Sequence, residues 1–489
     1  MFRRVARIVN DLNLDTDFLS SGNCVDCSPV TGEEIASFPL GDAETVERTV
    51  SRSLAAFHEW REVPPTGRSE LIRLFAEELR KNKEALIDLI MVETGKIRSA
   101  ALKEVERSIS LCESVASIPQ RLSGVSAPTE SHKLVISQSW LPLGPVAVVS
   151  SFNFPLRVWA LHALVALACG NSVIWRPSRK ATLTAFAVIS LLRRAKARCS
   201  ANCPEYLAQI LICDHPELML LAKNPQVPLI CATGAPAMAR RIQSLVGERL
   251  GRSILSTGGN NAAVIAPSAD IKLAVNHIVR STIADCGQRG TSLQRLFCHS
   301  SVYDTVVPLL KEEFQKVYVN SPFERQSMIG PLIDKVAYDT MRLSLEQATV
   351  DGGKVSGGNR LAVGNYQNAY YVQPALIEMP AQTGIVTTEQ LAPALYVMRY
   401  NDFDEAIDGI NAFPQTLVSC IFTNDLKEAG AFSSLDGAHT NVATVNAGTV
   451  GYDLAAMFGT DRNAVGSGTA SEPWRPFMQA KSCLVNFNC

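Results

Sequence analysis

The sequence predicts an α/β protein with two doubly wound parallel sheets and a smaller strand unit beside them. Two series of short apolar runs alternate with stretches of helical period, one starting at Pro145 and the other near Ser256. The length of 489 residues suits about three domains, and a hydrophobic content of 47% provides ample core.

The region before Pro145 is predicted to be mainly helical. Thr66 is a candidate N-cap for a helix whose apolar residues recur at helical spacing from Leu71 to Leu86, and Gly95 ends it. A second helix is expected from Val105 through Val115. Side chains then alternate over Lys133–Trp140, which predicts a strand.

The first alternating series predicts a parallel sheet with helices on both faces. Its expected strands are Val146–Ser150, Ser172–Trp175, Gln209–Cys213 and Leu229–Ala232. Its expected helices are Val158–Cys169, the stretch from Leu183 to Leu192, Pro216–Ala222 and the stretch around Ile242 and Leu245.

The second series predicts another α/β unit. Its expected strands are Asn260–Ile265, Arg295–His299, Ala394–Arg399, Ser419–Phe422 and Ala443–Val445. Asp270 is the expected cap of a helix that reaches Thr282, and a further helix is expected from Val307 to Phe314. The last segment, Ser482–Asn488, is predicted to be a strand.

Composition narrows the function classes. A net charge of −1 and a pI of about 6.7 favour neither a nucleic-acid partner nor an anionic membrane surface. The thirteen cysteines do not have the spacing of a disulfide framework, so we expect reduced thiols. Cys24 and Cys27 have no second cysteine pair at the spacing of a zinc site, so we expect no metal. We expect a cytoplasmic protein, because acidic residues follow the basic N-terminus too soon for a transit peptide. The apolar run Val158–Trp175 is expected to be a buried helix and strand, not a membrane span.

Five segments in a fixed order then point to a family. They are Phe152–Pro155, Ala168–Trp175, Gly258–Ala262, Gly287–Arg289 and Glu389–Pro393. With them the chain resembles the aldehyde dehydrogenase superfamily over nearly its whole length. The pairs Asn260-Asn261 and Gln288-Arg289 resemble the antiquitin (α-aminoadipate semialdehyde dehydrogenase) branch in particular.

The resemblance implies three regions. They are a Rossmann-like cofactor-binding domain (residues 1–123 and 143–255), a catalytic-type domain (256–446) and an oligomerisation flap (124–142 and 475–489). The flap implies a homodimer or homotetramer, or assembly with an active relative. The apolar strands of the flap are consistent with this, because edge strands of that kind take partners.

The resemblance also places the catalytic positions. Aldehyde oxidation in the family uses a cysteine thiolate and a glutamate that activates water. Here Gly290 stands at the cysteine position and Ser256 at the glutamate position; glycine cannot attack, and a serine hydroxyl is neutral at pH 7. Asn153 matches the amide that stabilises the oxyanion, or it is a turn residue. Cys286 is four residues from the missing thiol and is expected to be a packing residue.

The ligand-binding positions are partly kept. Arg289 matches the arginine that holds the amino-acid end of the antiquitin substrate, although a structural salt bridge is the alternative. Glu389 matches the glutamate that contacts the nicotinamide ribose, although a solvated loop carboxylate remains open.

The cofactor positions are Arg176, Ser178, Thr233 and Gly234. Arg179 replaces the family's ribose-binding glutamate, and a cation there suits a 2′-phosphate, so NADP is expected to be preferred over NAD. A merely solvated Arg176–Arg179 pair is the alternative. Ala235 and Ala239 remove a hydroxyl and a glycine of the phosphate segment, so we expect cofactor binding to be weak or lost.

Three functions remain open. The first, which the replacements favour, is an inactive homologue that acts as a partner or regulator. The second is an NAD(P)-dependent oxidoreductase that oxidises a semialdehyde to its acid through Cys286 or unusual chemistry. The third is a binding protein for a small carboxylate or semialdehyde through Arg289 and Asn153.

Overall fold

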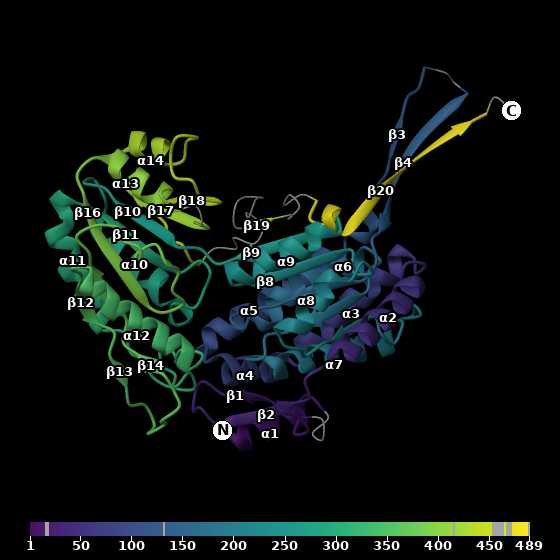
Figure 1. The fold of residues 1–489 in the computed structure, drawn as a ribbon, viewed down its shortest axis with the longest axis horizontal. Coiled ribbons are helices and arrows are strands. Elements are labelled where there is room, and N and C mark those ends of the chain that lie inside the picture. The colour runs from purple at the N-terminus through teal and green to yellow at the C-terminus, as the bar shows by residue number, and fades with distance from the viewer. Residues whose placement is uncertain (15–18, 131–132, 414–415, 452–463, 466–471, 488–489) are drawn as a thin grey trace.

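A computed structural model describes residues 1–14, 19–130, 133–413, 416–451, 464–465 and 472–487. Two sheets that are almost entirely parallel form two halves of the molecule (Figure 1). A three-stranded antiparallel sheet projects away from the half that contains the N-terminus. The predicted architecture of an α/β protein with two doubly wound sheets is therefore confirmed.

The first sheet has six strands in the order β19-β9-β8-β5-β6-β7. The five strands from β9 to β7 are parallel, and β19 runs antiparallel to β9. The strands are β5 (Val146–Val149), β6 (Val173–Arg176), β7 (Ala208–Ile210), β8 (Leu229–Gly234), β9 (Arg252–Thr257) and β19 (Ala464–Val465).

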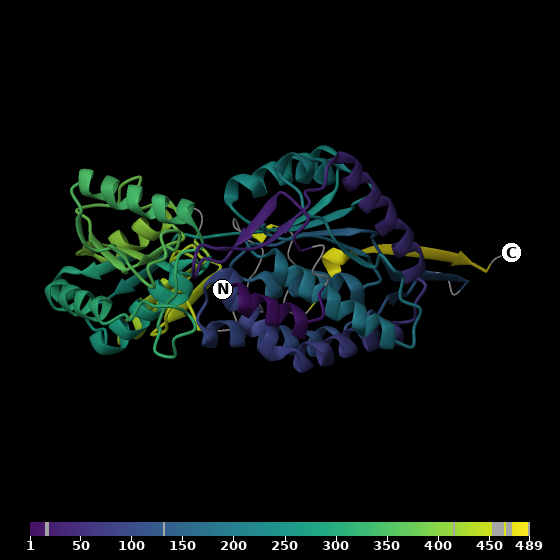
Figure 2. The same ribbon diagram turned by 90° about the horizontal axis from the view of Figure 1, so that it is seen from below.

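Helices cover both faces of this sheet because its strands are apolar on both sides (Figure 2). Val146 and Val148 of β5 belong to a core with one group of helices: α3 (Pro65–Lys81), α4 (Lys83–Thr94), α5 (Arg98–Val115), α6 (Pro155–Ala168) and α7 (Thr182–Arg198). Ala147 and Val149 belong to the opposite core, with α2 (Ala43–Trp60), α8 (His215–Lys223) and α9 (Pro236–Glu248). Helix α1 (Phe2–Asp11) buries Val5 and Ile8 in the first of these cores.

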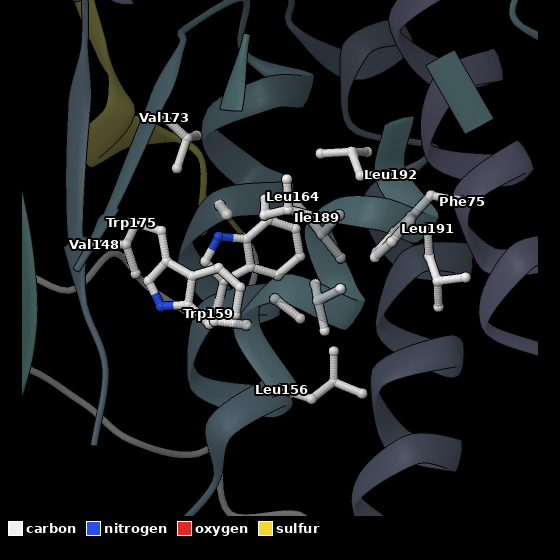
Figure 3. Close-up of a cluster of buried hydrophobic side chains, with 14 of the residues drawn as sticks. Phe75, Val148, Leu156, Trp159, Leu164, Val173, Trp175, Ile189, Leu191 and Leu192 are labelled. Carbon is white, nitrogen blue, oxygen red and sulfur yellow. The ribbon is translucent and has the colours of Figure 1, made fainter. Parts of the chain in front are cut away.

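Two tryptophans pack together in the first core (Figure 3). Trp159 of α6 stacks on Trp175 of β6 with 4.9 Å between ring centroids, and Phe75 meets the edge of Trp159. The Trp175 indole N–H donates to Ser150 Oγ at 2.8 Å. Because Ser150 directly follows β5, this bond ties the core to the segment that carries Asn153.

The second sheet has seven strands in the order β12-β15-β16-β11-β10-β17-β18. All neighbours are parallel except the edge strand β12. The strands are β10 (Asn261–Ile265), β11 (Leu293–His299), β12 (Lys354–Gly357), β15 (Ala375–Glu378), β16 (Ala394–Tyr400), β17 (Val418–Phe422) and β18 (Val442–Val445). The helices of this half are α10 (Ile271–Ile283), α11 (Ser300–Gln315), α12 (Lys335–Val350), α13 (Phe403–Asn411) and α14 (Leu426–Phe432).

The projecting sheet has the order β20-β4-β3 and pairs β4 along its length with the C-terminal strand. Its strands are β3 (Val125–Ala127), β4 (Leu134–Pro142) and β20 (Met478–Asn486). Smaller elements are the hairpins β1 (Cys24–Cys27) with β2 (Glu34–Phe38) and β13 (Arg360–Leu361) with β14 (Tyr371–Val372), and the 3-10 turns η1 (Pro119–Arg121), η2 (Ala284–Gly287) and η4 (Arg475–Phe477).

Three expectations need correction. Thr66 does not cap its helix, because α3 already begins at Pro65, whose fixed φ suits the first helical position. The predicted single helix up to Gly95 is two helices that break at Asn82, although Gly95 does end the second one with a left-handed φ of 70°. Strand β9 was not predicted; it spans residues 252–257 and pairs with β8 in the first sheet. Asn488, expected in the last strand, lies outside the described residues.

Two structural checks concern membranes and metals. Among the described residues, none of the helices is long and apolar enough to cross a bilayer. The same part of the chain holds no cluster of three or more His, Cys, Asp or Glu side chains that could bind a metal ion.

Candidate functional site

A cavity of about 1550 Å³ is lined by residues from both halves of the molecule. All nine residues that the sequence singled out for the site line it: Asn153, Arg176, Ser178, Thr233, Gly234, Ser256, Arg289, Gly290 and Glu389. Neither Arg179 nor Cys286 is among the lining residues. The fold therefore brings together positions that are more than 200 residues apart in the chain.

The loop that carries Gly290 has a strained backbone. Helix α10 ends at Ile283, and Asp285, Cys286 and Gly287 then adopt left-handed φ values of 52°, 57° and 70°. Left-handed backbone costs a non-glycine residue roughly 1–2 kcal/mol, so this turn needs external support. Cys286 thus lies within the turn that follows α10.

Hydrogen bonds from three amide side chains brace the loop. Asn261 Nδ2 donates to the carbonyls of Gly290 and Ser292, each at 2.8 Å. Asn153 Nδ2 donates to the Gln288 carbonyl at 2.8 Å, and Gln288 Oε1 accepts from the Ile333 N–H at 2.9 Å. Because these bonds engage backbone or neighbouring groups, none of them depends on which side chain is present at position 290.

A buried chain of charges supports the turn from the other half of the molecule. Lys96 Nζ lies 2.6 Å from Glu104 and 3.8 Å from Asp285, and Arg289 Nε lies 2.7 Å from Asp285. Burial alone would raise the pKa of Asp285, but the charges of Arg289 and Lys96 outweigh it and hold that pKa below its ordinary value. Asp285 is therefore a carboxylate at neutral pH, and Arg289 is already engaged by it.

Space exists at position 290 for a side chain. A Cβ atom there would lie 3.5 Å from the Gly258 Cα and 3.6 Å from Leu417 Cδ1, which are ordinary van der Waals distances. The φ of Gly290 is not in the left-handed region. Glycine at this position is thus not required by the backbone, and the cavity retains room for a thiol.

The nearest natural thiol cannot take that place. Cys286 is 1% exposed, and burial raises its pKa far above the ordinary range of a thiol. A nucleophilic cysteine must be a thiolate in contact with the substrate, so Cys286 is a packing residue.

Asn153 can still donate one hydrogen bond to a ligand. One of its two amide N–H groups donates to Gln288, and Ser151 Oγ donates to its Oδ1 at 2.6 Å. Among the described residues this leaves the second N–H for a ligand oxygen.

Glu389 is the one acidic residue among the described residues that line the cavity, against seven Lys or Arg side chains. A Cβ on Gly258 would lie 1.7 Å from Glu389 Oε1, so only glycine permits this close approach. Burial raises the Glu389 pKa to about 7, although the Gly259 N–H partly offsets it, and Oε1 is buried without a hydrogen-bond partner. This orphaned acceptor suits a ligand hydroxyl, and the surrounding charge suits an anion.

The two arginines expected at the cofactor end differ in role. Arg176 is buried, donates to the Cys213 carbonyl at 3.0 Å and has an unpartnered Nε. Arg179 forms a salt bridge of 2.5 Å with Asp214, which neutralises the cation proposed for a 2′-phosphate. Lys180, a lining residue that the sequence analysis did not single out, forms a salt bridge of 2.5 Å with Asp334 of the other half.

Met238 packs on one residue of the segment expected to hold a diphosphate. A Cβ on Gly234 would lie 2.7 Å from Met238 Cε, so the thioether packs directly on this glycine. Ala235 offers no hydroxyl, and Pro236 has no N–H at the start of α9. The cavity thus offers Glu389 to the ribose end of a dinucleotide, and Met238 lies beside Gly234 at the segment expected to hold the diphosphate.

Sequence reasoning assigned no role in supporting the loop to the residues that hold it in place: Lys96, Glu104, Asp285 and Asn261. Asp285 carried a local signal, because it is four residues before Arg289, a spacing at which opposite charges meet. The Lys96–Asp285 contact joins residues 189 positions apart, which no local pattern reveals.

Comparisons with known proteins agree with this architecture. The "Aldehyde dehydrogenase family" model matches residues 19–483. "Aldehyde dehydrogenase family 7 member A1" of Pisum sativum is 32% identical over 465 residues, covering 94% of this chain and 90% of that protein. "Alpha-aminoadipic semialdehyde dehydrogenase" of Bos taurus is 29% identical over 94% of this chain and 85% of its own length.

A solved structure also shares the fold. The structure of 3,6-anhydro-L-galactose dehydrogenase in complex with NAP superposes with a TM-score of 0.89 at 22% identity, covering 96% of this chain and 97% of the other. With a family model that matches nearly its whole length and relatives at up to 32% identity, the chain belongs to the aldehyde dehydrogenase family, among its antiquitin-like members.

Proposed function

We propose that this protein is a member of the family that does not oxidise aldehydes and instead binds a small carboxylate or semialdehyde, acting as a partner or regulator. The observation that carries the proposal is Gly290, which faces the cavity with no side chain at the position that the family resemblance assigns to the nucleophile. Cys286 supports it, because that thiol is buried and does not line the cavity.

The two replaced groups lower the expected rate of aldehyde oxidation by a large factor. Loss of a covalent nucleophile commonly lowers a rate by about a million-fold. Ser256 adds a second loss, since a hydroxyl is a poor base at neutral pH.

The alternative function is an NAD(P)-dependent semialdehyde oxidoreductase. Two observations favour it: the names of the pea and bovine relatives, and the hydrogen bonds that hold the loop around Gly290.

The purified protein is expected not to oxidise α-aminoadipate semialdehyde. NADH or NADPH formation, followed by absorbance at high protein concentration, should stay at the background of a heat-denatured sample. Turnover at an ordinary enzyme's rate, ~1 s⁻¹ or more, would contradict the proposal and favour the oxidoreductase.

Restoring both catalytic groups provides the matched positive test. Gly290→Cys should fold, because a Cβ there meets no atom closer than 3.5 Å. Without a carboxylate at position 256, release of the acyl group should remain slow. The double variant with Ser256→Glu should therefore exceed the product of the two single effects on aldehyde oxidation. Purely multiplicative effects would mean that the two positions do not act on one reaction.

We also expect the cavity to bind a small carboxylate. Arg289 lines the cavity with about one fifth of its side chain exposed, and its pairing with Asp285 makes any ligand compete for it. We expect α-aminoadipate to raise the melting temperature only at high micromolar to millimolar concentrations, as suits a Kd of roughly 0.1–1 mM. Arg289→Ala should abolish the shift, whereas Arg325→Ala, which removes an exposed arginine outside the cavity, should not. An equal shift in both variants would exclude Arg289 as the ligand residue.

Cofactor binding is expected to be weak. We propose NADP over NAD because Arg176 lines the cavity, although the Arg179–Asp214 bridge and Met238 both oppose tight binding. A Kd of tens of micromolar or weaker for NADP⁺ fits such a site.

The affinity for NADP⁺ should depend on pH through Glu389. Ribose hydroxyls donate to the ionised carboxylate, and a pKa of about 7 means that this form grows as the pH rises from 6 to 8. Affinity measured by calorimetry should increase up to about tenfold over this range, in proportion to the ionised fraction. Glu389→Gln should remove the dependence. Sub-micromolar NAD⁺ binding, or the same pH profile in both proteins, would contradict this assignment.

We also propose that the projecting sheet mediates assembly of a cytoplasmic homodimer or homotetramer, or assembly with an active relative. Strand β20 extends beyond the body of the molecule, and Leu484 and Phe487 are 61% and 63% exposed (Figure 1). Apolar side chains on a projecting sheet favour a protein partner.

The assembly can be tested by light scattering after gel filtration. The protein should be a dimer or tetramer at micromolar concentration, and Leu484→Asp should shift it towards the monomer. Leu435→Asp changes an equally apolar residue that is 96% exposed on the other half, and it should leave the mass unchanged. A wild-type monomer would rule out self-assembly.

A further inference from the structure

Two carboxylic acids are buried side by side at the start of helix α7, outside the cavity. Asp26 lies on β1 of the N-terminal hairpin and is 1% exposed; Glu93 lies near the end of α4 and is fully buried. Buried carboxyls are uncommon unless paired with cations, so a pair of them needs a physical reason.

Both side chains cap the same helix. Glu93 Oε1 accepts from the Leu183 N–H at 2.6 Å, and Glu93 Oε2 accepts from the Thr184 N–H at 2.7 Å and from the Thr184 hydroxyl. Asp26 Oδ2 accepts from the Thr182 N–H at 3.1 Å. Because the N-cap residue Ala181 has no capping side chain, these two carboxyls satisfy the first N–H groups of α7.

One oxygen of the pair has no donor from elsewhere in the described structure. Asp26 Oδ1 is buried and lacks a hydrogen-bond partner when both acids are counted as acceptors only. Asp26 and Glu93 cap neighbouring N–H groups of α7 and act on each other as hydrogen-bond partners, so a proton on Glu93 supplies a donor to Asp26. One shared proton therefore gives the pair a hydrogen bond that two carboxylates lack.

The surroundings favour this state. Burial raises the Asp26 pKa to about 6, and burial together with the neighbouring Asp26 raises the Glu93 pKa well above its ordinary value. The groups that act most strongly on the two carboxyls are each other and the uncharged donors of α7 and β1. The thiols of Cys24 and Cys27 flank Asp26 on β1, and the cations Arg176 and Arg179 act on Cys24.

We propose that Asp26 and Glu93 share one proton and that its loss releases the N-terminal hairpin β1–β2 from the start of α7. Two carboxylates in this buried place would repel each other and leave Asp26 Oδ1 without a donor. Helix α7 directly follows the segment 176–180, in which Arg176, Ser178 and Lys180 line the cavity. Asp26 and Glu93 are thus positioning residues for this wall of the cavity.

The direction of the pH effect follows from proton linkage. The docked pair holds one proton near neutral pH. In the released state Asp26 is exposed, and Glu93 still caps α7 but has lost the neighbouring carboxyl that raises its pKa, so this state holds fewer protons. Docking therefore weakens as the pH rises towards the Glu93 pKa of the docked state, by up to about tenfold in the docked-to-released ratio for each pH unit.

Hydrogen exchange of the wild-type protein at pH 6, 7 and 8 tests the proposal. Corrected for intrinsic exchange rates, the opening of amides in residues 24–38 and of the Thr182 amide should increase by up to about tenfold per pH unit. Asp26→Asn should remove this dependence, because its amide donates to an ionised Glu93 while its carbonyl still accepts from Thr182. Asp42→Asn, at the exposed cap of α2, should keep the wild-type slope. Equal slopes in wild type and Asp26→Asn would overturn the proposal.

Infrared spectroscopy gives a second readout that needs no change at the pair. In a Glu389→Gln background, which removes the cavity carboxyl with a raised pKa, a protonated carboxyl band should persist at pH 7 and fade as the hairpin amides open. Absence of this band at pH 7 would also overturn the proposal, even if Asp26→Asn failed to fold.

Discussion

The site depends on the left-handed turn at Asp285–Gly287 and on the buried charges that hold it. Two non-glycine residues in this conformation cost roughly 2–4 kcal/mol together. A hydrogen bond between charged groups contributes about 1.5–3 kcal/mol, so the bond from Arg289 to Asp285 is of the size needed to offset much of that strain. Lys96, 3.8 Å from Asp285, adds a Coulombic attraction. Removing one partner of a buried ion pair is expensive, which makes the arrangement stiff even if its net stabilisation is small.

Because of these contacts, the shape of the loop does not depend on the side chain at position 290. The Asn261 and Gln288 contacts engage backbone groups, so the loop keeps its course with glycine at position 290. The cavity therefore survives without a nucleophile, and its remaining features are those of a binding site: a basic lining, one amide N–H of Asn153 and an unsatisfied carboxyl oxygen on Glu389. The pairing of Arg289 with Asp285 limits how tightly a carboxylate can bind, because the ligand must replace an existing partner.

Much of the fold could be predicted, because its signals are local. The buried strands β5, β6 and β8 and the Asp270 cap of α10 were found within a residue or two of their observed bounds. Strand β9 was missed because Ser253, Ser256 and Thr257 dilute its apolar residues, and the break at Asn82 carries no glycine or proline.

The site residues were placed by family resemblance, whereas their partners were not. The pairing of Arg179 with Asp214 and of Lys96 with Asp285 depends on how separate elements pack, so the expected phosphate cation proved to be neutralised. The family resemblance predicted which positions form the site. The charge that each position presents to a ligand became known only from the salt bridges in the structure.

The central claim is that the cavity is intact but that, within the described part of the chain, none of the natural thiols lines it, and alkylation of the native protein tests this most directly. Iodoacetamide followed by peptide mass spectrometry should leave Cys286 unmodified in the wild-type protein, because it is buried and its pKa is raised. In Gly290→Cys, the introduced thiol should react readily under the same conditions, since position 290 lines the cavity. Native Cys286 that reacts as fast as a free cysteine would contradict the account, because the loop would then present a working nucleophile.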